Sequence, residues 1–299
     1  MSTLKLTVVL AFLSLVATAG CNKKQLIINA SFGLVEETSS AFFAEKDTVF
    51  AAEAAPGNLM LIEGMARGAP HNPQVLLVAS QMFGMYAFGF LEDCCAGEAE
   101  QQLAGQRAKE FYLRGKAYAL AALQLETDFD KMLALDQMSF EKALREIDAD
   151  QVPGLFWLTF NWGLYINLSR DDLSAIVDMP KVAALARRVA ELDPGYYYGG
   201  AHMFLMVYYG TLGKAVGGNP EEAKSEYRKA LTLSGEKFLM TKYLFAKTYC
   251  QQTMDRTLFE KTLTEIINAP EQLLPEQRLA NELAKKKAIR LLEKIDDIF

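Results

Sequence analysis

The sequence predicts an all-α protein, and three observations lead to that prediction. Apolar residues recur at helical spacing along the chain after residue 25, and no segment shows the alternation of a convincing β-strand. Small and large residues recur at positions i, i+4 and i+7 in several segments, and turn residues separate these segments. This pattern is typical of the second helix in tetratricopeptide-type hairpins. We therefore expect a degenerate tetratricopeptide-like array of helical hairpins, an α-solenoid closed into a compact body.

The clearest hairpin covers residues 196–231. Pro220 stands where a first-turn proline belongs, and Glu221 and Glu222 follow where the helix dipole favours acidic groups. Small side chains on one face let a neighbouring helix approach, and a ring between them fills the gap. The small, large and small positions are Ala223, Tyr227 and Ala230.

Four other segments carry related patterns at uneven intervals, which indicates insertions between the repeats. Their positions are Leu59, Glu63 and Ala66; Ala108, Tyr112 and Gly115; Ala183, Arg187 and Ala190; and Phe259, Leu263 and Ile266.

The remaining helices follow from apolar spacing and turn residues. Pro56, Gly57 and Asn58 predict a break in the first helical region. Gly84 and Gly89 predict close contact between helices. The expected helical segments are 26–55, 59–67, 74–91, 98–125, an acidic 129–147, an aromatic 154–168, 179–194, the 196–231 hairpin, 237–249, 258–268 and 275–298.

Residues 1–20 have the pattern of a signal peptide. Lys5 precedes an apolar run from 6 to 19 that is too short to span a bilayer comfortably, and small residues lead into Cys21. This junction resembles the lipobox of bacterial lipoproteins, which implies cleavage before Cys21 and acylation of its thiol. Asn22 after the cysteine suggests, by the same resemblance, the outer membrane. The alternative is an ordinary signal peptide with a stray cysteine; in the lipoprotein interpretation, 21–25 form a short tether and 26–299 one helical domain.

Charge argues against a nucleic-acid partner. The chain has 31 basic and 37 acidic residues, a formal net charge of −6. The one basic run, Lys285 to Lys287, lies in a predicted helix, where we expect a solvated face.

The chemistry-bearing residues do not form an enzyme-like pattern. Two histidines are too few for a histidine-based metal site, and HExxH, GxSxG, GxGxxG and CxxC are all missing from the sequence. We expect the acidic pairs Glu92–Asp93 and Asp171–Asp172 to be helix caps or solvated charge. The sequence thus predicts a non-enzyme without a metal or cofactor.

Three further cysteines, Cys94, Cys95 and Cys250, match no zinc-site spacing. Because cysteine is often buried and adjacent cysteines rarely pair, free thiols are the favoured state. The sequence also allows the alternative of a disulfide bond from Cys94 or Cys95 to Cys250.

Several blocks, together with the signal peptide, resemble the TatT component family of TRAP transporters. The resemblance covers nearly the whole chain after the signal, and its most specific block is DPGYYYGGAHMFL. It implies cryptic tetratricopeptide hairpins, a narrow apolar tunnel and association with the solute-binding protein of a tripartite ATP-independent periplasmic system that takes up small ligands. The blocks are YAFGFLED (86–93), FYLRGKAYALAAL (111–123), LFWLTFNWGLYINLSRDD (155–172), MPKVAALARRVAELDPGYYYGGAHMFL (179–205), GGNPEEAKSEYRKAL (217–231) and EKFLMTKYLFAKTY (236–249).

Aromatic residues are the ligand-site candidates, because an apolar passage with a few polar groups selects small amphiphiles. For any single residue, the favoured interpretation is core packing between hairpins. His202 could bond a carbonyl group, and Arg170 could bind a carboxylate or pair with Asp171 or Asp172. The candidates are Tyr196, Tyr197, Tyr198, His202, Trp157, Asn161, Trp162, Tyr165 and Arg170.

Two functions remain from the sequence. The first is a lipid-anchored, periplasm-facing transport accessory that binds a solute-binding protein and passes a small, partly hydrophobic or carboxylate ligand through an apolar tunnel. The second is a general envelope scaffold for protein–protein interaction without a ligand. The sequence does not decide whether the chain forms a homo-oligomer.

Overall fold

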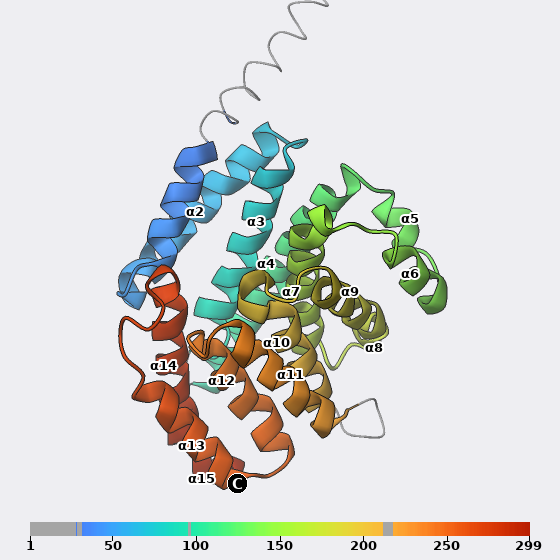
Figure 1. Ribbon diagram of the computed structural model, residues 1–299. Helices are drawn as coiled ribbons and strands as arrows, with labels where there is room; N and C mark the ends of the chain where they lie inside the picture. Colours follow the sequence, from blue (N-terminus) through green and yellow to red (C-terminus); the bar gives the residue numbers. More distant parts are fainter. Residues whose placement is uncertain (1–27, 29–31, 95–96, 212–217) are drawn as a thin grey trace, which may run out of the picture.

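The computed structural model describes residues 28, 32–94, 97–211 and 218–299. The predicted signal peptide, Cys21 and Cys95 lie outside these residues. The described residues are predominantly helical and contain no strand, which confirms the all-α prediction (Figure 1).

The helices follow one another with short connections. Residues 32–43 are helical and precede the labelled elements. The elements are α2 (Thr48–Gly68), α3 (Pro73–Tyr86), the π-helix η1 (Ala87–Leu91), α4 (Glu98–Gln124), α5 (Phe129–Leu133), α6 (Gln137–Leu144), the 3₁₀-helix η2 (Ala149–Gln151), α7 (Val152–Leu168), α8 (Leu173–Ile176), α9 (Met179–Leu192), α10 (Tyr196–Thr211), α11 (Pro220–Leu233), α12 (Leu239–Phe245), the π-helix η4 (Ala246–Cys250), α13 (Arg256–Ile267), the 3₁₀-helix η5 (Pro275–Gln277), α14 (Arg278–Glu293) and α15 (Ile295–Ile298).

Side-chain caps fix several helix starts. The Asn72 side chain accepts a hydrogen bond from the Val75 backbone N–H at 3.1 Å, and Pro73 follows it in the first turn of α3. Asn219 and Pro220 start α11 in the same way. Each cap satisfies a backbone N–H that the helix itself leaves unpaired.

Three predicted helix boundaries are wrong. The expected helix 26–55 is interrupted after residue 43, and Asp47 caps the start of α2 by accepting from the Val49 and Phe50 N–H groups. The expected break at residues 56–58 does not occur, because α2 runs through Pro56, which is exposed on the helix surface. The missing hydrogen bond of the proline therefore falls where water can reach the backbone. The expected helix 129–147 is instead α5 and α6, since Asp136 caps a new helix through the Met138 and Ser139 N–H groups.

Consecutive helices pack pairwise, and the chain then closes on itself. α3 packs on α2 and α4, α4 on α7, α7 on α9, and α10 on α9 and α11. The last long helix, α14, lies beside α2, and the Lys286 Nζ donates a hydrogen bond to the Thr48 hydroxyl (Figure 1). Both ends of the described chain thereby belong to one body.

The predicted repeat positions mostly face the interior. Ala108, Tyr112, Ala183, Ala223 and Ala230 are all fully buried. In the hairpin of α10 and α11, the ring of Tyr227 stacks on Phe245 with centroids 3.8 Å apart. This burial agrees with the expected packing, whereas the likeness to tetratricopeptide repeats stays an interpretation.

The apolar stretch Pro73–Leu91 is long and apolar enough to cross a membrane by length and composition. Half of its most apolar window is buried inside the body, against α2, α4 and α7. We interpret this stretch as a core helix, because a helix buried in the core of a protein can have the same length and apolar composition as a membrane span.

Candidate functional site

A cavity of about 850 Å³ lies between α7, α10, α12 and α14 and the two π-helices. This is within the usual size range of small-molecule sites. Its inner wall is apolar and mostly buried, with Phe88, Phe156, Met203, Phe238 and Met240. The cavity therefore fits the hydrocarbon part of a small molecule.

Both π-helices form part of this wall. η1 contributes Phe88 and Gly89, and η4 contributes Lys247 and Thr248. A π-helical turn inserts an extra residue into a helix and re-aims its side chains, and such turns are frequent at functional sites. Because both π-helices line the same cavity, we regard the cavity as a candidate functional site.

The start of α10 is left-handed, which brings Tyr197 to the cavity. Tyr197, Tyr198 and Gly199 have φ values of 47°, 59° and 77°. Such angles are costly for tyrosine and persist only where the surroundings hold them. The Tyr197 ring packs edge-on against Trp157 at 5.0 Å and lines the cavity.

Few polar groups of the cavity are free to meet a ligand. The hydroxyls of Thr159, Thr211 and Thr248 each donate to a carbonyl oxygen one turn earlier in their own helix. Arg170 differs, because it forms no ion pair with a carboxylate of the described residues and donates only to the Asn167 side chain. Its side chain is exposed yet lines the cavity, which places it at the mouth.

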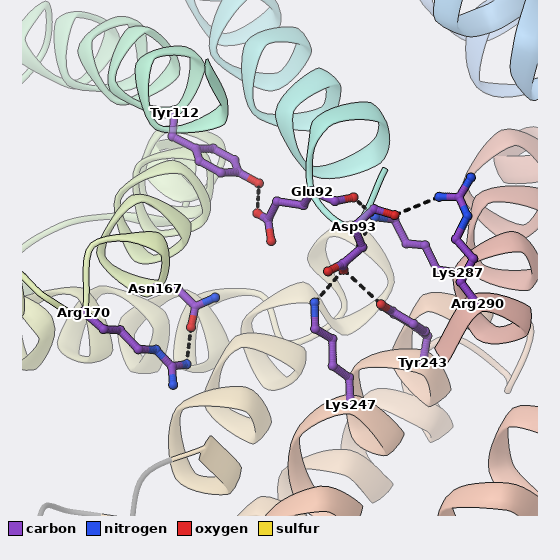
Figure 2. Close-up of polar contacts among 9 residues, drawn as sticks. All are labelled: Glu92, Asp93, Tyr112, Asn167, Arg170, Tyr243, Lys247, Lys287 and Arg290. Atoms are coloured by element: carbon purple, nitrogen blue, oxygen red, sulfur yellow. Dashed lines mark hydrogen bonds and ion pairs between the residues drawn. The ribbon is translucent and has the colours of Figure 1, made fainter. Parts of the chain in front are cut away.

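A cluster of charged residues forms another part of the wall, around the end of η1 (Figure 2). The Tyr112 hydroxyl donates to Glu92 Oε1. Asp93 Oδ2 accepts from Lys247 Nζ at 2.5 Å and from the Tyr243 hydroxyl at 3.0 Å. The backbone carbonyls of Glu92 and Asp93 accept from two basic residues of α14, Lys287 and Arg290 respectively.

Burial and charge shift the titration of this cluster in different directions. Burial raises the pKa of Glu92, since the ionised carboxylate loses its hydration. Burial also tends to raise the pKa of Asp93. The positive charges of Lys247 and Lys287 outweigh this effect and lower the pKa of Asp93 to about 2. Burial lowers the pKa of Lys287 to about 8, although Asp93 opposes this shift.

Comparison with known proteins places the chain in a family. Residues 44–299 match the family described as TRAP transporter T-component. The chain belongs to the TRAP transporter T-component family. An uncharacterized protein of Treponema pallidum (strain Nichols) is 23% identical over 313 residues, covering 97% of this chain and 96% of that protein.

Family membership confirms the resemblance that the sequence suggested. It makes the chain an accessory component of a TRAP transporter, with an envelope or periplasmic context, and it suggests a non-enzymatic role.

Of the predicted ligand residues of this T-component, Tyr197 and Arg170 line the cavity. The structure places the other aromatic candidates in the surrounding packing. Trp157 and Trp162 are buried, and Lys116 lies 3.9 Å from the Trp162 ring centroid. The candidates outside the cavity wall that pack between helices are Trp157, Trp162, Tyr165, Tyr196 and Tyr198.

The two other polar candidates hold helices together. Asn161 is fully buried in α7, and its Nδ2 donates to Ser80 Oγ of α3 at 3.1 Å. His202 Nδ1 lies 2.5 Å from Glu226 Oε2, which ties α10 to α11. The contact with Glu226 accounts for His202 without a ligand, whereas Asn161 Oδ1 is buried without a hydrogen-bond partner among the described residues and does not line the cavity.

Sequence reasoning missed the charged cluster. The expectation that Glu92–Asp93 would be a cap or solvated charge is wrong for Glu92, which is only 6% exposed. The expectation of a solvated face is wrong for Lys287, which is 3% exposed. Lys247 lies in the largely apolar stretch 238–250, where a charge at helical spacing could have drawn attention to it.

The cysteines differ from the favoured expectation. Cys94 is disulfide-bonded, so it is not a free thiol. Cys250 is free and buried, which contradicts a bridge to Cys250. Burial raises the pKa of its thiol to about 12, so this thiol is unreactive.

Proposed function

We propose that the protein is a lipid-anchored periplasmic accessory of a TRAP transporter that binds the solute-binding protein and holds or passes a small amphiphilic carboxylate. The observation that carries this proposal is the apolar cavity with Arg170 at its mouth. An arginine without an acidic partner can bind a carboxylate through paired N–H groups. The apolar wall then takes the hydrocarbon part.

The anchor rests on the signal-peptide pattern before Cys21, which lies outside the described residues. Several acyl chains would hold the protein stably on a membrane, in our proposal the outer one. The full chain is acidic, with a net charge of −6, and would gain nothing from anionic lipid, so the anchor itself must supply the attachment.

Ligand binding can be tested with straight-chain fatty acids as probes. We expect them to bind the purified protein in isothermal titration calorimetry, and Arg170→Gln to weaken binding about 10-fold, the effect of losing one charged hydrogen bond. Arg107→Gln, an exposed arginine on α4, is the matched control. Equal affinities of both variants would contradict the role of Arg170.

Partner binding needs a separate experiment. The protein is captured from crosslinked cells under native conditions, and co-captured proteins are identified by mass spectrometry. We expect the solute-binding protein of a TRAP system. Capture of an assembly chaperone or a cell-wall enzyme, without any solute-binding protein, would instead favour the general scaffold.

A further inference from the structure

Glu92 has one carboxyl oxygen that the protein leaves unused. Oε1 accepts from the Tyr112 hydroxyl, whereas Oε2 has no hydrogen-bond partner among the described residues. The side chain is only 6% exposed and yet lines the cavity. In Figure 2 the second oxygen points away from Tyr112, toward the side where Lys247 and Asn167 lie.

A polar atom on the wall of an apolar cavity loses its hydration when a ligand fills the cavity, which is costly unless the ligand itself meets that atom. None of the neighbouring groups donates a hydrogen bond to this oxygen: Lys247 and Tyr243 donate to Asp93, and Lys287 donates to the Glu92 backbone carbonyl. Glu92 directly follows the π-helix η1 and its side chain lines the cavity. The unused oxygen and its place on the cavity wall therefore point to a contact inside the cavity.

We propose that Glu92 is a specificity-determining residue of the cavity, which donates a hydrogen bond to an uncharged oxygen atom in the tail of the ligand. This inference rests on the proposed ligand-binding function. It selects an amphiphilic acid whose tail carries a hydroxyl or carbonyl oxygen over the same acid with a plain hydrocarbon tail. The carboxylate of the ligand stays at Arg170.

The protonation state of Glu92 supports this chemistry. Burial raises the pKa of Glu92, so the neutral acid, which has an O–H to donate, persists to higher pH than in an ordinary glutamate. As pH rises through the raised pKa, Glu92 becomes an acceptor only and repels a carbonyl oxygen. A hydroxyl group, which can donate as well, keeps its hydrogen bond.

Several other charged or titratable groups lie near Glu92. Asp93 is ionised above about pH 2, and Lys287 loses its proton near pH 8. The pKa values of Tyr112 and Tyr243 are raised well above their usual range, chiefly by burial. Lys247 and Arg290 complete the set.

The test compares fatty acids that carry a ketone in the tail with parent acids of equal length, titrated calorimetrically into the full chain over a range of pH. We expect the wild type to prefer the oxo acids about 10-fold at low pH, the effect of one buried hydrogen bond, and to lose that preference as pH rises. The wild type should prefer hydroxy acids over the parent acids throughout the pH range. Glu92→Gln, whose amide donates at every pH, should keep the oxo-acid preference without pH dependence.

Glu92→Leu should bind parent acids and show no preference, and Glu110→Gln, an exposed glutamate on α4, should behave like the wild type. Circular dichroism checks the fold, and if Glu92→Leu does not fold, the pH profile of Glu92→Gln decides. Equal binding of oxo and parent acids by the wild type, or a pH-dependent preference in Glu92→Gln, overturns the inference and leaves the proposed function standing. If no acid of any series binds, both fail.

Discussion

At the scale of single residues, the packing of α3, α4 and α7 depends on how closely these helices approach one another. Gly115 of α4 faces the Asn161 side chain of α7, and its carbonyl oxygen accepts from the Ser80 hydroxyl of α3 at 2.8 Å. A Cβ at position 115 would overlap the Asn161 amide. Glycine is thus required here by contact between helices and not by backbone angle.

Gly115→Ala should destabilise the protein by about 1–3 kcal/mol, because the Asn161 side chain is buried and cannot move away. Gly105→Ala, in the same helix, meets nothing within 4 Å and should be neutral or stabilise by up to about 1 kcal/mol. Urea unfolding of both variants measures the difference. Equal destabilisation by Gly115→Ala and Gly105→Ala would contradict the close contact between Gly115 and the Asn161 side chain.

Asp93 should give the protein a defined acid sensitivity. Its folded pKa of about 2 lies below the ordinary value of 3.8, so its contribution to stability is present above pH 3.8 and is lost as pH falls toward 2. Asp93→Asn should therefore be less stable than the wild type at neutral pH, and the difference should shrink over that range. Urea unfolding at several pH values checks this; a difference that is independent of pH would argue against the ion pairs with Lys247 and Lys287.

At the scale of elements, the limits of sequence reasoning lie in tertiary contacts. The spacing and turn residues predicted a helix over 98–125, and the structure has Glu98–Gln124. A helix pattern does not fix which side faces a cavity, and so Trp157 and Asn161 were grouped with Tyr197, although only Tyr197 lines it. Lys287 is buried because α14 folds back on the end of η1, a contact 195 residues away in sequence.

α2 shows the same override by tertiary structure, since it continues through Pro56. Pro56→Ala should stabilise the protein by about 1–2 kcal/mol, because it restores a helix hydrogen bond and removes a steric clash, offset in part by the freer unfolded chain. Thermal unfolding monitored by circular dichroism tests this, with Glu53→Ala on the exposed side of α2 as control. A lower midpoint for Pro56→Ala would contradict this account of the proline.

At the scale of the whole molecule, the closure of α14 onto α2 completes the cavity. Ala280 and Leu283 of α14 form wall together with residues of α7 and α10 from the middle of the chain. An open array of hairpins would present these residues on a concave surface, whereas the closed body encloses them. This closure is the reason why we propose a ligand-binding accessory component and not a scaffold that binds only proteins.

We propose that the cavity of this TRAP transporter T-component holds an amphiphilic acid. A crystal structure of the protein grown with decanoic acid would show whether it does. We predict density for the acyl chain beside Phe160, Phe204 and Tyr197, with the carboxylate at Arg170. A structure in which the acid binds elsewhere on the protein, and the cavity holds none, would contradict the claim.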